Sequence, residues 1–182
     1  EDGIRDKLVT GVQTCALPIS LLAMDRQMAR VWQARAPGLS LHTPEDALVL
    51  ASIIEKETGQ GQDRPMISSV FHNRLRLGMP LQTDPTVIYG LGPQFDGDLR
   101  RIHLKTDHPW NTYTRTGLPP TPIALPGKAS LMAAVQPAQS QALYFVARGD
   151  GSSQFSNDLA AHNAAVERYQ IRRSASPSAK AQ

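Results

Sequence analysis

The segment between residues 107 and 127, DHPWNTYTRTGLPPTPIALPG, holds five of the chain's 14 prolines and restricts the possible fold more than any other feature. Proline fixes φ and donates no backbone hydrogen bond, so a long helix or a central strand is excluded here. A long proline-rich connection in a compact domain is usually functional or disordered. Because this one also carries Trp110, Tyr113 and Leu118, we expect an ordered loop that lines a groove.

The part of the chain before residue 78 has helical periodicity, broken at regular intervals. Apolar residues recur at three- and four-residue steps from Leu21 to Ala36, and Pro37-Gly38 ends that pattern. A second helix is predicted from an N-cap at Thr43 to about residue 58, with proline and two acidic residues in its first turn. A third helix is predicted over residues 64–77.

After Gly78 the periodicity disappears, and short elements are predicted only further on. These are a helix at 129–135, a strand at 142–148, a partner strand at 154–157 and a closing helix at 159–171. The sequence therefore predicts an α+β fold, mainly helical, with a small antiparallel sheet and long ordered proline-rich loops that line a groove.

The two ends of the chain differ from the middle. Residues 1–19 resemble a peptide that arises when sequencing-adapter DNA is translated, so we expect this segment to be non-native and exclude it from fold reasoning. The single cysteine, Cys15, lies within it, which leaves no cysteine for a disulfide or a thiolate site elsewhere. Residues 173–182 are rich in Ser, Ala, Pro and Lys, and we expect a disordered tail.

Composition excludes several classes of function. The net charge of +3 and pI of about 9.3 are mildly basic. The sequence has no long Lys/Arg run of the kind that indicates nucleic-acid binding. No apolar run reaches the roughly 18 residues that a membrane span needs. The five histidines include no pair at the HxxxH spacing of a metal site, and no glycine-rich phosphate loop occurs. We expect neither a metal nor a cofactor.

Two glutamates, Glu55 and Glu57, stand in the otherwise apolar segment ALVLASIIEKETG. On a helical wheel both lie at the margin of apolar faces, so periodicity does not choose between them. A partly desolvated carboxyl has a raised pKa and can act as a general acid near neutral pH. The alternative is a structural ion pair with a cation of a neighbouring helix, for example Arg74 or Arg76.

Several motifs together resemble one family. LASIIEKETG, VFHNRLRLGMPLQTDPTVIYGLG, WNTYTRTGLPPTPIALPG, LYFVARGDG and FSNDLAAHN occur in order between residues 43 and 169. They resemble the catalytic domain of the endolytic murein transglycosylases, the YceG-like (MltG) family of bacterial envelopes. The resemblance implies a catalytic domain over residues 42–172. It also implies that residues 20–41 are the remnant of a preceding region, which in this family ends in a LysM-like subdomain.

The resemblance implies a chemistry that needs one glutamate. It assigns the catalytic role to Glu55, the first glutamate of EKET, as general acid and then base. The implied reaction cleaves the bond between N-acetylmuramic acid (MurNAc) and N-acetylglucosamine (GlcNAc) in peptidoglycan, leaves a 1,6-anhydroMurNAc end and terminates or trims nascent strands. The candidate substrate-binding residues are Asn73, Gln82, Thr83, Asp84, Tyr89, Asn111 and Tyr113.

The resemblance also implies a location and partners. It places the protein at the cytoplasmic membrane, held by a single N-terminal helix outside this sequence, with the catalytic domain on the extracytoplasmic side. The partners implied are peptidoglycan strands and peptidoglycan synthases. Two other functions stay open: a non-catalytic peptidoglycan-binding module, and a pyridoxal-phosphate enzyme like aminodeoxychorismate lyase. The second needs a Schiff-base lysine, for which only Lys56, Lys105 and Lys128 are available outside the two ends.

Overall fold

The computed structural model describes residues 23–171, so the expectations for residues 1–19 and 173–182 lie outside the described residues. A first helix covers 23–33. The further elements are α2 (Pro44–Glu57), α3 (Arg64–Arg76), α4 (Asp84–Leu91), the short η1 (Gly92–Gln94), α5 (Arg101–Lys105), α6 (Lys128–Val135), β1 (Tyr144–Ala147), β2 (Ser153–Ser156), α7 (Leu159–Val166) and the π-helical turn η2 (Glu167–Ile171). Between residues 23 and 171 no helix is long and apolar enough to cross a membrane.

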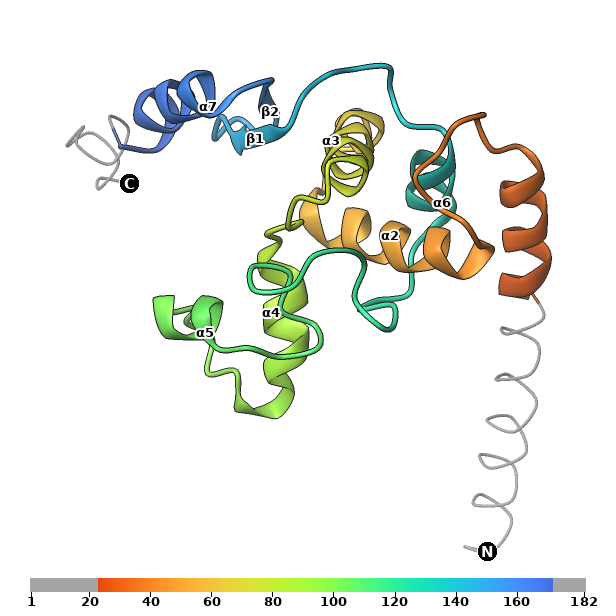
Figure 1. The fold of residues 1–182 in the computed structure, drawn as a ribbon, viewed down its shortest axis with the longest axis horizontal. Helices are drawn as coiled ribbons and strands as arrows, with labels where there is room; N and C mark the ends of the chain where they lie inside the picture. The colour runs from red at the N-terminus through yellow and green to blue at the C-terminus, as the bar shows by residue number, and fades with distance from the viewer. Residues whose placement is uncertain (1–22, 172–182) are drawn as a thin grey trace, which may run out of the picture.

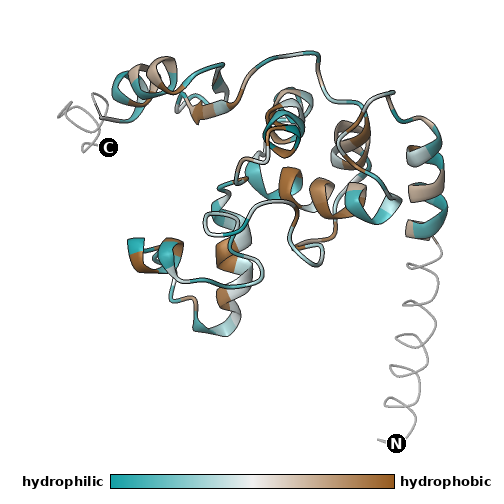
Figure 2. Ribbon diagram, in the orientation of Figure 1, coloured by the Kyte–Doolittle hydropathy of each residue, from teal (hydrophilic) through white to brown (hydrophobic). Residues whose placement is uncertain are grey.

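Helix α2 lies at the centre of the core. Its start follows the sequence signal, because the Thr43 hydroxyl accepts from the N–H of Asp46 and the Asp46 carboxylate accepts from the N–H of Thr43. The helix packs against α6, α3 and α4, and much of the ribbon of α2 and α6 is brown in Figure 2, the colour of hydrophobic residues. The most deeply buried large side chains are Phe71, Leu50, Ile53, Ile54, Ile67, Leu81 and Leu131.

A hairpin and a helix form the C-terminal part of the described chain. Strands β1 and β2 pair antiparallel, with Phe145 opposite Phe155, and α7 packs against both strands. Figure 1 shows this unit (blue) at one end of the molecule, reached from α6 by an extended segment. Phe145 also meets Phe71 of α3 edge to face at 6.1 Å between ring centroids, which ties the hairpin to the core.

The chain after Gly78 was expected to be irregular, but the structure corrects this expectation, because helices α4 and α5 form there. The segment DPTVIYGL is rich in β-branched residues and has proline at its second position, so intrinsic propensity argues weakly for a helix. Burial of Thr86 and Val87 outweighs that weak propensity. The Thr86 hydroxyl also donates to the carbonyl of Thr83 at 2.8 Å and bonds the Thr112 hydroxyl at 2.8 Å, which joins α4 to the proline-rich loop.

The proline-rich segment is ordered, as expected. Hydrogen bonds from side chains replace the regular ladder that its prolines prevent. The Asn111 amide donates to the carbonyls of His103, Leu104 and Thr106 at 2.7–3.2 Å, and the N–H of Ile123 donates to the Ser52 hydroxyl of α2 at 3.0 Å. The predicted fold class is confirmed: a mainly helical α+β fold with a two-stranded antiparallel sheet.

Candidate active site

A cavity of about 680 Å³ lies where the end of α2 meets the start of α4, the hairpin and α7. It is open to solvent and brings together polar side chains that are spread along the chain between residues 57 and 170. Its polar and charged lining residues are Glu57, Arg74, Gln82, Asp84, Tyr113, Tyr144, Ser153, His162, Asn163 and Gln170. Glu55 is not among the residues that line it.

Glu57 is the last residue of α2 and the acidic group that this cavity perturbs most. Its side chain is partly buried, and burial raises its pKa to about 7, with a smaller contribution from the nearby negative charge of Asp84. A carboxyl with a pKa near 7 is protonated in a large fraction of molecules at neutral pH, yet can still lose its proton. A carboxyl with this pKa can both give and take a proton near neutral pH.

Asp84 and Tyr113 form a pair next to Glu57. The Tyr113 hydroxyl donates to Oδ1 of Asp84 at 2.5 Å. Burial of the Tyr113 ring, together with this bond, holds the pKa of the phenol well above its usual value, so Tyr113 remains a donor at neutral pH. The Asp84 carboxylate thus lies fixed at the start of α4, and its charge opposes ionisation of Glu57.

Arg74 of α3 lines the cavity and bonds to two other segments, the turn before α4 and the residue before β1. Its guanidinium is buried and donates to the carbonyls of Leu143 at 2.7 Å, Pro80 at 3.0 Å and Leu81 at 3.0 Å. It also donates to Oε1 of Gln82 at 3.1 Å. Gln82 has a positive φ of 56°, which is uncommon for a residue other than glycine and marks a constrained backbone at the cavity wall.

Glu55 occupies a different environment from the one expected. Its Oε2 accepts from the Ser130 hydroxyl at 2.6 Å and from the N–H of Gly127 at 3.1 Å, and Arg64 of α3 lies 3.9 Å from Oε1. The Ser130 bond first, and the Gly127 bond second, lower the pKa of Glu55. The expectation that Glu55 holds a proton near neutral pH is wrong, because these donors stabilise its charged form. An ion pair to a neighbouring helix does form, with Arg64 in place of Arg74 or Arg76.

The position of Glu55 at the N-terminus of α6 predicts a pH-dependent contribution to stability. Because its pKa is lowered in the folded state, the stabilisation is present above the unfolded value of about 4.5 and is lost as the pH falls through the folded value. We expect Glu55→Ala to lower the free energy of unfolding by about 1–3 kcal/mol at pH 7, since buried Ser130 then lacks its acceptor.

Urea unfolding at pH 7 and at pH 4 measures this difference between Glu55→Ala and the unaltered chain, and the difference should shrink at pH 4. Glu45→Ala, an exposed position on the same helix, is the matched control. Equal stability of Glu55→Ala and the unaltered chain at pH 7 would contradict this role.

The predicted substrate-binding residues separate into two groups. Gln82, Asp84 and Tyr113 line the cavity that contains Glu57. The others bind the protein itself or face elsewhere. The Asn73 amide donates to the carbonyls of Ser140 and Ala142, and the Asn111 amide donates to the carbonyl of Thr106. Thr83 is buried, and its hydroxyl donates to the hydroxyl of Thr86. Tyr89 is exposed and packs against Trp110, with 5.7 Å between the ring centroids.

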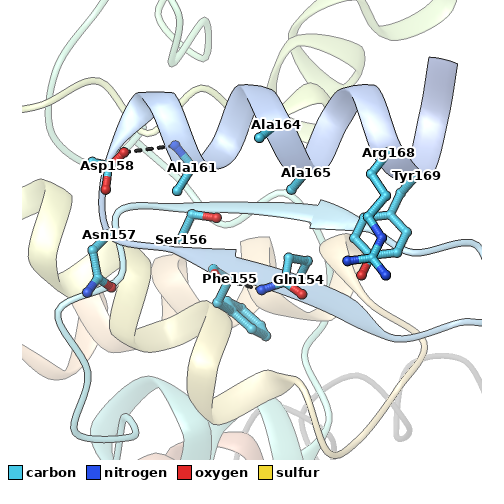
Figure 3. Close-up of a pocket in the computed structure, with 10 residues that line it drawn as sticks. All are labelled: Gln154, Phe155, Ser156, Asn157, Asp158, Ala161, Ala164, Ala165, Arg168 and Tyr169. Carbon is cyan, nitrogen blue, oxygen red and sulfur yellow. Dashed lines mark hydrogen bonds between the residues drawn. The ribbon is translucent and has the colours of Figure 1, made fainter. Parts of the chain in front are cut away.

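A second cavity, of about 550 Å³, lies between the other face of α7 and strand β2 (Figure 3). Its acidic lining residue, Asp158, is already engaged as the N-cap of α7, where its carboxylate accepts from the N–H of Ala161 at 2.8 Å. Ala161, Ala164 and Ala165 provide much of the remaining wall. Because the carboxylate among its lining residues already caps a helix, this cavity is the weaker candidate.

Helical periodicity left the choice between Glu55 and Glu57 open, the family resemblance favoured Glu55, and neither line of reasoning identified Tyr144 or His162. These two side chains reach the cavity from β1 and α7, about 90 and 105 residues after Glu57. No local sequence pattern predicts contacts between residues so far apart in the chain. The signal that could have pointed to His162 is its place in FSNDLAAHN, one of the motifs behind the resemblance.

The profile of the YceG-like family matches residues 18–168, most of the chain. This chain belongs to the YceG-like family. It is 48% identical over 122 residues to the endolytic murein transglycosylase of Bacillus subtilis (strain 168), and this match covers 67% of this chain and 34% of the relative. It is 30% identical over 156 residues to the endolytic murein transglycosylase of Streptococcus pneumoniae (strain D39), with 82% and 28% covered.

A solved structure has the same fold. The crystal structure of a YceG-like protein from Listeria monocytogenes matches with a TM-score of 0.64 and 38% sequence identity, over 82% of this chain and 45% of that protein. The chain therefore spans about a third of the length of the curated YceG-like relatives it matches.

Proposed function

We propose that this YceG-like chain is the catalytic domain of an endolytic lytic transglycosylase in which Glu57, rather than Glu55, transfers the proton. The substrate is the peptidoglycan glycan strand, cut between MurNAc and GlcNAc. The observation that carries the proposal is the carboxyl of Glu57, which has a pKa of about 7 and lines an open cavity. The substrate class comes from the endolytic murein transglycosylases that the chain resembles at 30–48% identity.

The reaction proceeds in two proton transfers and consumes no water. Protonated Glu57 donates to the glycosidic oxygen, the bond from that oxygen to C1 of MurNAc breaks, and GlcNAc leaves with a free hydroxyl. Ionised Glu57 then takes the proton of the MurNAc C6 hydroxyl, and the C6 oxygen bonds to C1 to give the 1,6-anhydro ring. Glu57 ends protonated, as it began, so one carboxyl is sufficient.

Asp84 affects the protonation of Glu57 in this cycle. Glycosidases that use water or an enzyme nucleophile need a second carboxylate free to act on the substrate. Here Asp84 accepts the hydroxyl of Tyr113, and its charge helps to keep the proton on Glu57. We therefore assign Asp84 an electrostatic role, with Gln82 and Tyr113 as groove-lining residues.

The cellular setting of this proposal is the one that the family resemblance implies. We propose an extracytoplasmic location at the cytoplasmic membrane, with the domain acting on strands near the peptidoglycan synthases and ending or trimming nascent glycan. Catalysis needs neither a metal nor an organic cofactor, because the proton transfers and the internal hydroxyl supply the whole reaction.

The test is a product analysis of purified glycan strands, incubated with the chain in water enriched in oxygen-18. We expect new 1,6-anhydroMurNAc ends by mass spectrometry, and no oxygen-18 in the products. Reducing MurNAc ends that carry oxygen-18 would show hydrolysis, and strand binding without cleavage would show a binding module. Either result would overturn the proposal.

A further inference from the structure

His162 of α7 lines the same cavity as Glu57, and the proposed reaction leaves its role unassigned. Its imidazole stacks on the ring of Tyr144, with 5.1 Å between centroids and 23° between the planes. Tyr144 in turn lies against the guanidinium of Arg74, 5.1 Å from the ring centroid. The stack fixes the orientation of the imidazole relative to the cavity.

Neither ring nitrogen of His162 hydrogen-bonds to another described residue, and Nδ1 is fully buried without a partner. Buried polar atoms in native proteins are nearly always paired, so an exception needs an explanation. Packing against Tyr144 does not explain it, because phenylalanine would stack as well without burying a polar atom. The nitrogens of His162 therefore point to a use other than packing.

The burial of Nδ1 indicates which nitrogen carries the proton. A buried N–H without an acceptor is more unfavourable than an acceptor that lacks a donor. The proton therefore belongs on Nε2, the nitrogen that is not sealed in the protein. Burial first, and the charge of Arg74 second, lower the pKa of His162, so the ring is neutral at pH 7 and presents one donor.

We propose that His162 binds the glycan in this cavity, with its Nε2–H donating to an acceptor oxygen of an N-acetylated sugar that lies against Glu57. This inference rests on the proposed function and adds a residue that contacts the substrate. The acceptor is an acetamido carbonyl or a hydroxyl oxygen. MurNAc and GlcNAc each carry both kinds of oxygen. Hydrogen bonds from a stacked, pre-oriented ring are well suited to hold one sugar in register.

The groups around His162 explain why a neutral donor suits this position. Glu57 of α2, Asp84 of α4, Arg74 of α3 and Tyr144 of β1 all line the same cavity, and the Tyr144 ring lies between the imidazole and the Arg74 guanidinium as a partner of both. An imidazolium here would favour ionisation of Glu57 and so oppose its role as an acid. A neutral imidazole donates to sugar oxygen without disturbing that proton.

Binding of glycan strands, stripped of their stem peptides, tests the inference. The measurement is calorimetry in a Glu57→Gln background, where cleavage is expected to be about 10²–10⁴-fold slower, with His162→Phe and His162→Gln added. Phenylalanine keeps the stack and removes the donor, so we expect binding about tenfold weaker, the effect of losing one hydrogen bond. Glutamine restores an N–H donor, and we expect partial recovery. Thermal melting of each variant establishes that it is folded.

The outcomes separate the two proposals. Folded His162→Phe that binds as tightly as its parent would overturn the inference alone. A parent that binds no strand would overturn the proposed function as well. If His162→Phe does not fold, nitrogen-15 NMR of the unaltered His162 in the Glu57→Gln chain takes its place. A protonated Nε2 whose resonance shifts on strand addition supports the inference, and an unshifted resonance overturns it.

Discussion

Glu57→Gln is expected to abolish most cleavage of glycan strands, with the rate of anhydro-end formation falling by about 10²–10⁴-fold. Glutamine matches glutamate in size and still forms hydrogen bonds, but it has no proton to give to a glycosidic oxygen. The fold should persist, because replacing the acid removes a carboxyl whose burial disfavours its charged form. Initial rates on purified strands, with anhydro ends counted by mass spectrometry, measure the change.

Glu55→Gln is the matched control, since it makes the same chemical change two residues earlier on the same helix. Its oxygen still accepts from Ser130 and Gly127, so we expect a folded protein that keeps most of the cleavage rate. The reverse pattern, with activity lost in Glu55→Gln and retained in Glu57→Gln, would return the catalytic role to the glutamate that the family resemblance favours.

Arg74→Met is expected to give the largest loss of stability. Methionine preserves much of the apolar stem but leaves the carbonyls of Pro80, Leu81 and Leu143 without their donor. We expect the free energy of unfolding to fall by about 3 kcal/mol or more, because several buried acceptors lose their partner at once. Cleavage should fall too, since Arg74 joins the hairpin to the turn before α4.

Urea unfolding measures the stability of Arg74→Met, and Arg101→Met serves as the control at an exposed position of α5. A surface change of that kind is expected to stay within about 0.5 kcal/mol of the unaltered chain. If Arg74→Met were no less stable than Arg101→Met, the carbonyl contacts of Arg74 would not hold the cavity wall together as described.

Local signals predicted the elements where the sequence carries its own start and stop. The Thr43 N-cap, the helix 64–77, the strand 142–148 and the helix 129–135 match observed elements to within about two residues at each end. Helix α4 was not predicted, because DPTVIYGL has little helix propensity and forms where tertiary burial favours it.

The choice between Glu55 and Glu57 lay beyond local reasoning. The two side chains point about 200° apart around α2, so each borders a different neighbour. Glu55 meets the start of α6, more than 70 residues later in the chain, and Glu57 meets α4. Only the packed structure shows that the first neighbour supplies hydrogen-bond donors and the second supplies burial and negative charge.

Polar residues of the motifs were equally ambiguous. Asn73 and Asn111 belong to sequence blocks of the family, yet their amides donate to backbone carbonyls of the chain itself. Tyr113 and Asp84 come from the same blocks and line the cavity. A polar side chain that satisfies buried backbone and one that faces a substrate look alike in a sequence, because both need hydrogen-bonding atoms.

The most direct test of the central claim is a carbon-13 NMR titration of the side-chain carboxyls of Glu55 and Glu57 in the same sample. The account predicts that Glu57 titrates with a pKa near 7 and that Glu55 titrates below its usual value of 4.5. A Glu57 that titrates near 4.5, or a Glu55 that titrates near 7, would contradict the claim that Glu57 carries the reactive proton.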